Sequence, residues 1–169
     1  MTAPQLVLVG LPGAGKSTVG QLLAQTWHVG YRDTDDDIEA LTNMSIADIF
    51  ITEGESKFRE LERAAVVRAL AEHDGVLALG GGAILDARTR TDLAGHRVVY
   101  LRVSLAAASP RIGLSGSRPL LVGSPRKQWL TLADQRKPLY EALATVTVST
   151  DDRSPEQVVQ QILTKLEQR

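Results

Sequence analysis

The 169-residue sequence contains no cysteine, few aromatic residues and almost no net charge, and each shortage excludes a class of function. Without cysteine there are no disulfides, no thiolate metal sites and no cysteine nucleophile. Aromatic residues make up 4% of the chain, which is too little for a platform on which nucleobases stack. The formal net charge is −1, so no basic field attracts nucleic acid or an anionic membrane. We therefore expect neither nucleic acid nor membrane as a partner.

Long apolar segments are also missing. No run approaches the length that spans a bilayer, and the N-terminus has no basic segment followed by a long apolar core. These absences predict a cytoplasmic protein. With 43% hydrophobic and 23% charged residues, the chain has the composition of one globular domain over 1–169.

The most informative stretch that is present runs from 10 to 17 and reads GLPGAGKS. It follows the apolar run 6–9 and precedes a helical segment over 16–27, the order of elements that a phosphate-binding loop requires. N–H groups of such a loop and of the helix N-terminus point at the bound anion. Lys16 adds a positive charge, and the Ser17 hydroxyl can bind Mg²⁺. A plain flexible turn is the alternative, but the flanking strand and helix favour nucleotide binding.

Short apolar runs alternate with helical segments along the chain. Four of the five candidate strands are near-continuous apolar runs, as expected for parallel strands buried on both faces. Helix starts are marked by Ser45 and by Ser154-Pro155, and a further helix is expected over 53–72. The alternation predicts right-handed crossovers and a three-layer α/β sandwich. The candidate strands cover residues 5–9, 29–32, 76–79, 98–101 and 144–148.

Charge is concentrated in two segments. Residues 33–39 hold five acids and no base, and they begin where the second strand should end, at the sheet edge where ligands bind. Residues 111–137 hold six bases and one acid, which suits a segment that encloses a triphosphate or a carboxylate. A solvated helix start remains the alternative for Asp36 and Asp37. Solvated side chains are expected at Arg126, Lys127 and Lys137.

Two signatures of other nucleotide-binding proteins are missing. No apolar strand ends in the Asp-Glu pair of a motor or helicase, and the Asn-Lys-x-Asp stretch that reads guanine in switch GTPases is absent. A small kinase acting on a bound metabolite fits better, and it needs an acid near the acceptor hydroxyl, nearby cations and a lid against water. We expect the lid in the Gly-, Ser- and Pro-rich stretch 113–125, which contains Arg118. Arg136 precedes Pro138, which predicts a helix end near Arg136.

Six motifs follow one another between residue 6 and about residue 153. They are GLPGAGKST at 10–18, DTD at 33–35, FRELE at 58–62, LGGGA at 79–83, RPLL at 118–121 and RKPLY at 136–140. In this order and combination, the chain resembles the shikimate kinase family. The resemblance implies Mg²⁺-dependent transfer of the γ-phosphate of ATP to the 3-hydroxyl of shikimate, a step towards chorismate and the aromatic amino acids. It also implies a five-stranded parallel sheet of order 2-3-1-4-5, as in P-loop nucleoside-monophosphate kinases, and we expect a monomer.

The resemblance assigns the ATP site to the phosphate loop and three arginines. Lys16 would contact the transferred group, Ser17 would bind Mg²⁺, and Asp33 would bind the same ion through water. Arg118, on a mobile lid over about 112–126, would fold over the phosphates. Arg111 would lie against adenine and Arg153 near the same base. The loop residues implied to hold the phosphates are Gly13, Ala14, Gly15, Lys16, Ser17 and Thr18.

The resemblance places the shikimate site in the segment 34–62 and in two later motifs. Asp35 would accept a hydrogen bond from the 3-hydroxyl and act as its base or orienting group. Arg59 and Arg136 would clamp the carboxylate, since a guanidinium fork fits that planar anion, and Glu62 would hold Arg59. The remaining contacts would come from the N–H groups of Gly81 and Gly82 and from the rings of Phe50 and Phe58. For the two rings the alternative is plain core, and for Arg59 it is a surface ion pair with Glu55 or Glu62.

Two other functions stay open. A gluconate-type kinase shares the loop and the early acids, and gluconate also carries a carboxylate, although the DTD, FR and GGG combination favours shikimate. A non-catalytic nucleotide-binding relative of these kinases would normally have lost an acceptor residue. Here Asp35, Arg59, Gly81 and Arg136 are all present.

Overall fold

The computed structural model describes residues 2–112 and 125–168, without the side chains of 110–112 and 125. In this part of the chain five strands form one parallel sheet with the order β2-β3-β1-β4-β5. The predicted strand order and direction are therefore confirmed. The strands are β1 (Leu6–Val9), β2 (Tyr31–Asp33), β3 (Val76–Ala78), β4 (Val98–Arg102) and β5 (Val146–Ser149).

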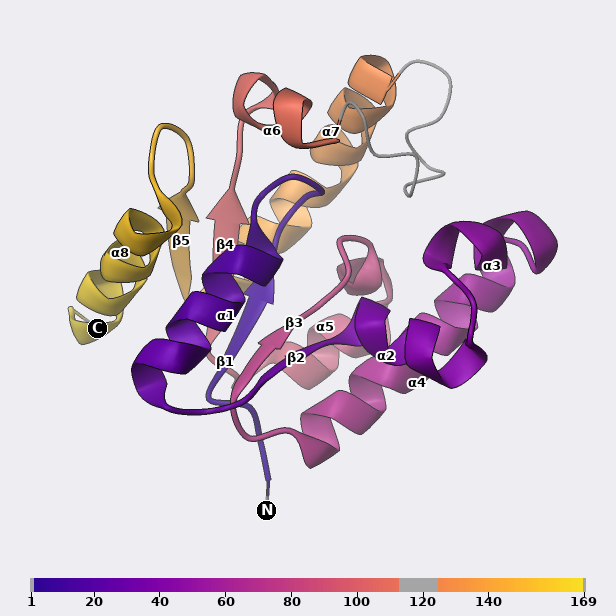
Figure 1. The fold of residues 1–169 in the computed structure, drawn as a ribbon, viewed down its shortest axis with the longest axis horizontal. Coiled ribbons are helices and arrows are strands. Elements are labelled where there is room, and N and C mark those ends of the chain that lie inside the picture. The colour runs from indigo at the N-terminus through magenta and orange to yellow at the C-terminus, as the bar shows by residue number, and fades with distance from the viewer. Residues whose placement is uncertain (1, 113–124, 169) are drawn as a thin grey trace.

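Helices cover both faces of this sheet, and α1 and α8 pack together on one of them (Figure 1). The predicted three-layer α/β sandwich is thereby confirmed. The described helices are α1 (Lys16–Trp27), α2 (Thr34–Thr42), α3 (Ile46–Thr52), α4 (Glu55–Glu72), α5 (Ala87–Leu93), α6 (Leu105–Ile112), α7 (Pro125–Leu143) and α8 (Pro155–Glu167), with a 3-10 turn η1 (Ala83–Leu85). None of the helices in the described ranges is both long and apolar enough to cross a bilayer.

The main core lies around β1, the central strand of the sheet, and its neighbours β3 and β4. Every residue of β1 is buried, and so are the first four residues of β4. The edge strands differ, since β2 is half-buried and β5 alternates between buried and partly exposed residues. Continuous apolar runs thus mark the strands that are covered on both faces.

A second, smaller apolar cluster holds α2, α3 and α4 together. Its buried members are Ile38, Ile49, Phe58 and Ala65. The cluster stabilises the predicted substrate-binding segment 34–62 locally, at the side of β2. Ser45 caps α3 by accepting a hydrogen bond from the Asp48 N–H, at 3.1 Å, as its position in the sequence predicted.

Two helix boundaries differ from those predicted. The helix expected over 53–72 begins at Glu55, because Glu53 is the C-cap of α3 and Gly54, with φ 88°, separates the two helices. The helix end expected near Arg136 is not there, since α7 continues through Pro138 to Leu143. Trp129 and Tyr140 are buried on either side of this proline. Packing therefore outweighs the cost of a proline inside the helix.

Candidate functional site

The phosphate loop lies between the carboxyl end of β1 and the start of α1. Gly13 and Gly15 have φ values of 87° and 84°, in the left-handed region, and Gly15 is the N-cap of α1. Lys16 donates from Nζ to the carbonyl oxygens of Gly10 and Leu11, at 2.7 and 3.3 Å. The ammonium group therefore lies over its own loop, at the N-terminus of a 12-residue helix whose dipole favours an anion.

Ser17 and Asp33, the two residues assigned to Mg²⁺, both lie near the side chain of Tyr31. The Tyr31 hydroxyl donates to Asp33 Oδ2 at 3.3 Å, and Ser17 is among the neighbours that act on the pKa of that hydroxyl. The described residues contain no cluster of three or more metal-ligating side chains of His, Cys, Asp or Glu. Mg²⁺ beside nucleotide phosphates is commonly held by one or two protein groups together with waters and phosphate oxygens. A serine hydroxyl and one carboxylate at the loop fit that requirement.

The Asp-Thr-Asp motif links the start of α2 to the end of β3. Asp33 is the N-cap of α2 and accepts a hydrogen bond from the Asp35 N–H at 2.8 Å. The buried Thr34 hydroxyl accepts a hydrogen bond from the Gly80 N–H at 3.1 Å. The middle residue of the motif thus attaches the glycine stretch after β3 to the acidic helix start, which the sequence did not predict.

The three glycines 80–82 each face a different charged side chain. A Cβ on Gly80 would lie 2.5 Å from Asp35 Oδ1, and one on Gly82 would lie 2.5 Å from an Arg59 nitrogen. At Gly81 it would lie 3.0 Å from an Arg136 nitrogen. Any side chain at 80 or 82 would displace a charged group. The glycine stretch therefore lets one carboxylate and two guanidinium groups approach the same short piece of backbone.

Arg59 reaches the site from α4 and is paired with two carboxylates. Its guanidinium donates to Glu62 Oε1 at 2.7 Å, and Glu55 Oε1 lies 3.7 Å from it. Glu62 is only 4% exposed, and burial raises its pKa to about 7 although Arg59 lowers it. Glu55 is largely exposed. The predicted hold of Glu62 on Arg59 is thus present, and because Glu62 is buried the two do not form a plain surface ion pair.

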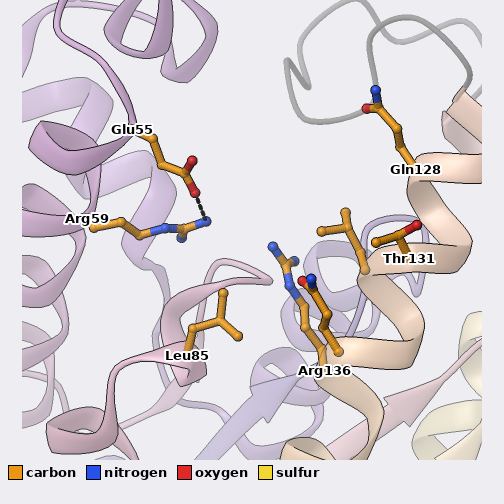
Figure 2. Close-up of a pocket in the computed structure, with 8 residues that line it drawn as sticks. Glu55, Arg59, Leu85, Gln128, Thr131 and Arg136 are labelled. Carbon is orange, nitrogen blue, oxygen red and sulfur yellow. Dashed lines mark ion pairs between the residues drawn. The ribbon is translucent and has the colours of Figure 1, made fainter.

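Arg136 reaches the site from α7 and is only 2% exposed. Burial lowers the pKa of its guanidinium, and its Nε has no hydrogen-bond partner among the described residues. Figure 2 shows Arg59 and Arg136 on opposite sides of a cavity of about 280 Å³ between α4 and α7. A buried, incompletely satisfied cation is unfavourable without a ligand. An anion bound between the two guanidinium groups would satisfy it.

Phe50 and Phe58 lie together, with ring centroids 4.7 Å apart, in the apolar cluster of α2, α3 and α4. The Arg59 guanidinium lies 5.3 Å from the centroid of the Phe58 ring. The Phe58 ring thus contacts Arg59 from within the apolar cluster, and Phe50 packs against Phe58, which agrees with a core role. Their predicted contact with the substrate remains a prediction.

Of the arginines predicted to lie at the outer part of the ATP site, Arg153 is the one whose side chain is among the described residues. Arg153 is exposed in the turn between β5 and α8, where it donates to the Ser149 carbonyl at 2.8 Å. The Arg111 side chain, Arg118 and the lid residues 113–124 lie outside the described residues. Arg126, Lys127 and Lys137 are exposed, as predicted.

Two further side chains of α7 contact the site without having been predicted. Trp129 donates from Nε1 to the Pro12 carbonyl in the phosphate loop at 3.0 Å. Tyr140 donates from its hydroxyl to the Gly81 carbonyl. Tyr140 ends the RKPLY motif, so a signal for it was present in the sequence, whereas Trp129 is an isolated aromatic residue without one.

The family model and the curated relatives that match this chain both belong to the shikimate kinase family. Residues 12–167 match the family model described as shikimate kinase. A curated shikimate kinase of Streptomyces coelicolor is 58% identical over 167 residues, covering 99% of this chain and 98% of the relative.

Solved structures also include a shikimate kinase that closely resembles this chain. The shikimate kinase of Acinetobacter baumannii, determined in complex with shikimate, superposes with a TM-score of 0.94 at 34% identity, covering 99% of this chain and 94% of the other. A gluconokinase of Sinorhizobium meliloti reaches a TM-score of 0.66 at 19% identity, over 98% and 93% of the two chains, and this likeness concerns the fold alone.

Proposed function

We propose, from the premise that the chain belongs to the shikimate kinase family, that it transfers the γ-phosphoryl group of ATP to the 3-hydroxyl of shikimate. The observation that carries the proposal is the convergence of Asp35, Arg59 and Arg136 on the glycine stretch 80–82. The carboxylate can accept a hydrogen bond from a ligand hydroxyl, and the two guanidinium groups can bind a ligand carboxylate. Together they match a small hydroxy acid.

Phosphoryl transfer depends mainly on positioning and on charge stabilisation. The 3-hydroxyl oxygen attacks the γ-phosphorus, the bond from that phosphorus to the β–γ bridging oxygen breaks, and ADP leaves. The hydroxyl proton passes to Asp35 and then to solvent. Arg59 and Arg136 hold the carboxylate of the acceptor, while Lys16 and the N–H groups of residues 13–18 hold the transferred phosphoryl group. Arg118 and Arg111 are proposed to cover the phosphates and adenine, with Arg153 near the same base.

We assign the Mg²⁺ site to Ser17, with Asp33 acting through water. When bound, the ion neutralises charge on the phosphate oxygens. The hydrogen bond from Tyr31 to Asp33, beside Ser17, supports the assignment. We also propose a cytoplasmic monomer of one domain, with the acceptor segment at 34–62 and a mobile lid at about 112–126. The use of ATP suits the cytoplasm.

An ADP-release assay tests the activity. The purified chain is supplied with ATP, Mg²⁺ and shikimate, gluconate or no acceptor. We expect ADP release that depends on shikimate. Release with gluconate alone would favour the other small-metabolite kinase, and ATP binding without any acceptor-dependent turnover would favour the non-catalytic relative.

The Asp35→Asn variant tests the role of the carboxylate. We expect kcat to fall by roughly 100-fold or more, because a positioned acid–base group contributes about 10²- to 10⁴-fold, with ATP affinity unchanged. Asp36→Asn is the matched control, since Asp36 is exposed on the same helix. Parent-like turnover in Asp35→Asn would remove Asp35 from the mechanism.

A further inference from the structure

Tyr140 is a buried tyrosine whose hydroxyl lies beside the acceptor site without lining the cavity described above. Its ring is 0% exposed and stacks on Tyr100 of β4, with centroids 5.0 Å apart and an interplanar angle of 27°. Its hydroxyl donates to the Gly81 carbonyl at 2.5 Å. The stacked pair fixes the ring, and the ring in turn fixes where this donor points.

The hydrogen bond to the Gly81 carbonyl orients the whole peptide between Gly81 and Gly82. That peptide is planar and trans, so its N–H group, which belongs to Gly82, points away from the carbonyl. A peptide between two glycines has little steric resistance to rotation. Holding the carbonyl towards Tyr140 therefore keeps the Gly82 N–H directed to the opposite side of the peptide.

The same hydroxyl also interacts with Arg136, one helical turn before Tyr140 on α7. Arg136 in turn lies against Gly81, where a Cβ would come within 3.0 Å of its guanidinium. Tyr140, Arg136 and the Gly81 peptide thus form one connected group. A shift in any of them would move the other two.

We propose that Tyr140 is a positioning residue, which holds the Gly82 N–H and the Arg136 guanidinium in the arrangement that receives the hydroxy acid. The inference rests on the proposed function for the identity of that acid, but the backbone contact stands without it. A merely structural tyrosine would stabilise the fold and leave the two substrates equally affected. A positioning tyrosine acts on the acceptor and not on the nucleotide.

Kinetics of the Tyr140→Phe variant of the full chain separate these two roles. The variant keeps the stacked ring and loses one hydrogen bond. We expect the KM for shikimate to rise roughly 3- to 10-fold, as for loss of one buried hydrogen bond, and the KM for ATP to stay unchanged. Tyr100→Phe, which loses a hydroxyl from the same stacked pair, should leave both KM values unchanged. An unchanged shikimate KM in Tyr140→Phe, equal rises for both substrates, or an equal effect of Tyr100→Phe would overturn the proposal.

A measurement without substrates separates this proposal from the proposed function. In protein labelled with ¹⁵N-glycine, a hydrogen bond to the Gly81 carbonyl affects the amide resonance of Gly82 directly. We expect this resonance to move and to broaden in Tyr140→Phe but not in Tyr100→Phe. Should Tyr140→Phe not fold, 3-fluorotyrosine at position 140, a stronger donor of similar shape, should shift the same resonance. An unmoved Gly82 resonance would overturn the role of Tyr140 even if the parent phosphorylates shikimate, and a parent without that activity would overturn only the proposed function.

Discussion

The two guanidinium groups of the site are in different environments. Arg59 is held by Glu62, whereas Arg136 has no carboxylate within ion-pair distance among the residues that the structure describes, although it is almost fully buried. Burying a charge without a partner is costly. An anionic ligand between the two guanidinium groups would offset this cost, and we then expect the protein to be less stable without that ligand than with it.

Replacing Arg136 by methionine should separate stability from function. The apolar side chain has a similar length and carries no charge, so we expect the melting temperature without ligand to stay the same or to rise. The KM for shikimate should rise at least about 30-fold, corresponding to the 2 kcal/mol or more that a buried charge contact contributes, while the KM for ATP changes little. Lys137→Met, at an exposed neighbour on α7, is the control. Equal weakening of both substrates would instead indicate that Arg136 contacts the phosphates.

At the level of secondary structure, α7 connects the two halves of the site. Trp129, Arg136 and Tyr140 are spaced seven and four residues apart, so they share one face of the helix. That face contacts the phosphate loop through Pro12, the acceptor cavity through Arg136 and the glycine stretch through Gly81. A displacement of α7 would therefore affect the nucleotide and acceptor sites together.

The contact of Trp129 with the phosphate loop can be tested by the Trp129→Phe variant. Phenylalanine fills much of the same space but cannot donate to the Pro12 carbonyl. We expect the KM for ATP to rise roughly 2- to 10-fold, as for the loss of one buried hydrogen bond, and the KM for shikimate to rise less. Trp27→Phe is the control, because Trp27 lies at the far end of α1 from the loop. An ATP KM that is the same in both variants would contradict the role of Trp129.

For the molecule as a whole, the buried Glu62 makes stability depend on pH. Burial raises its pKa from an ordinary 4.5 to about 7, with Asp35 adding to the rise and with Arg59 and Arg136 opposing it. Between these two values the folded chain holds a proton that the unfolded chain has released. The free energy of unfolding therefore falls as the pH rises from 4.5 to 7.

The Glu62→Gln variant should remove this pH dependence. Glutamine is neutral throughout, so we expect the melting temperature of the variant to fall less than that of the parent between pH 5 and pH 7.5, a range chosen to span about the window above. Above pH 7, where the parent buries an ionised carboxylate at a net cost, we expect the melting temperature of the variant to equal or exceed the parent's. Glu60→Gln is the control, since Glu60 is exposed on the same helix. An identical slope in Glu62→Gln and the parent would show that another group dominates.

The sequence by itself determined the parts of this protein that depend on local order. The phosphate loop is readable because strand, glycines and helix are contiguous, and β1, β3 and β4 are readable because strands covered on both faces are largely apolar. The strand order and the implied site residues came from motifs that resemble a family, and the assigned roles of those residues remain predictions. No local rule could have supplied them.

Only the tertiary structure decided which groups meet. The pairing of Gly80, Gly81 and Gly82 with Asp35, Arg136 and Arg59 joins residues from four separate parts of the chain. The unbroken α7, the raised pKa of Glu62 and the contacts of Trp129 and Tyr140 likewise depend on burial and on neighbours distant in sequence. Burial and long-range packing are properties of the folded chain, and a linear pattern of residue types does not contain them.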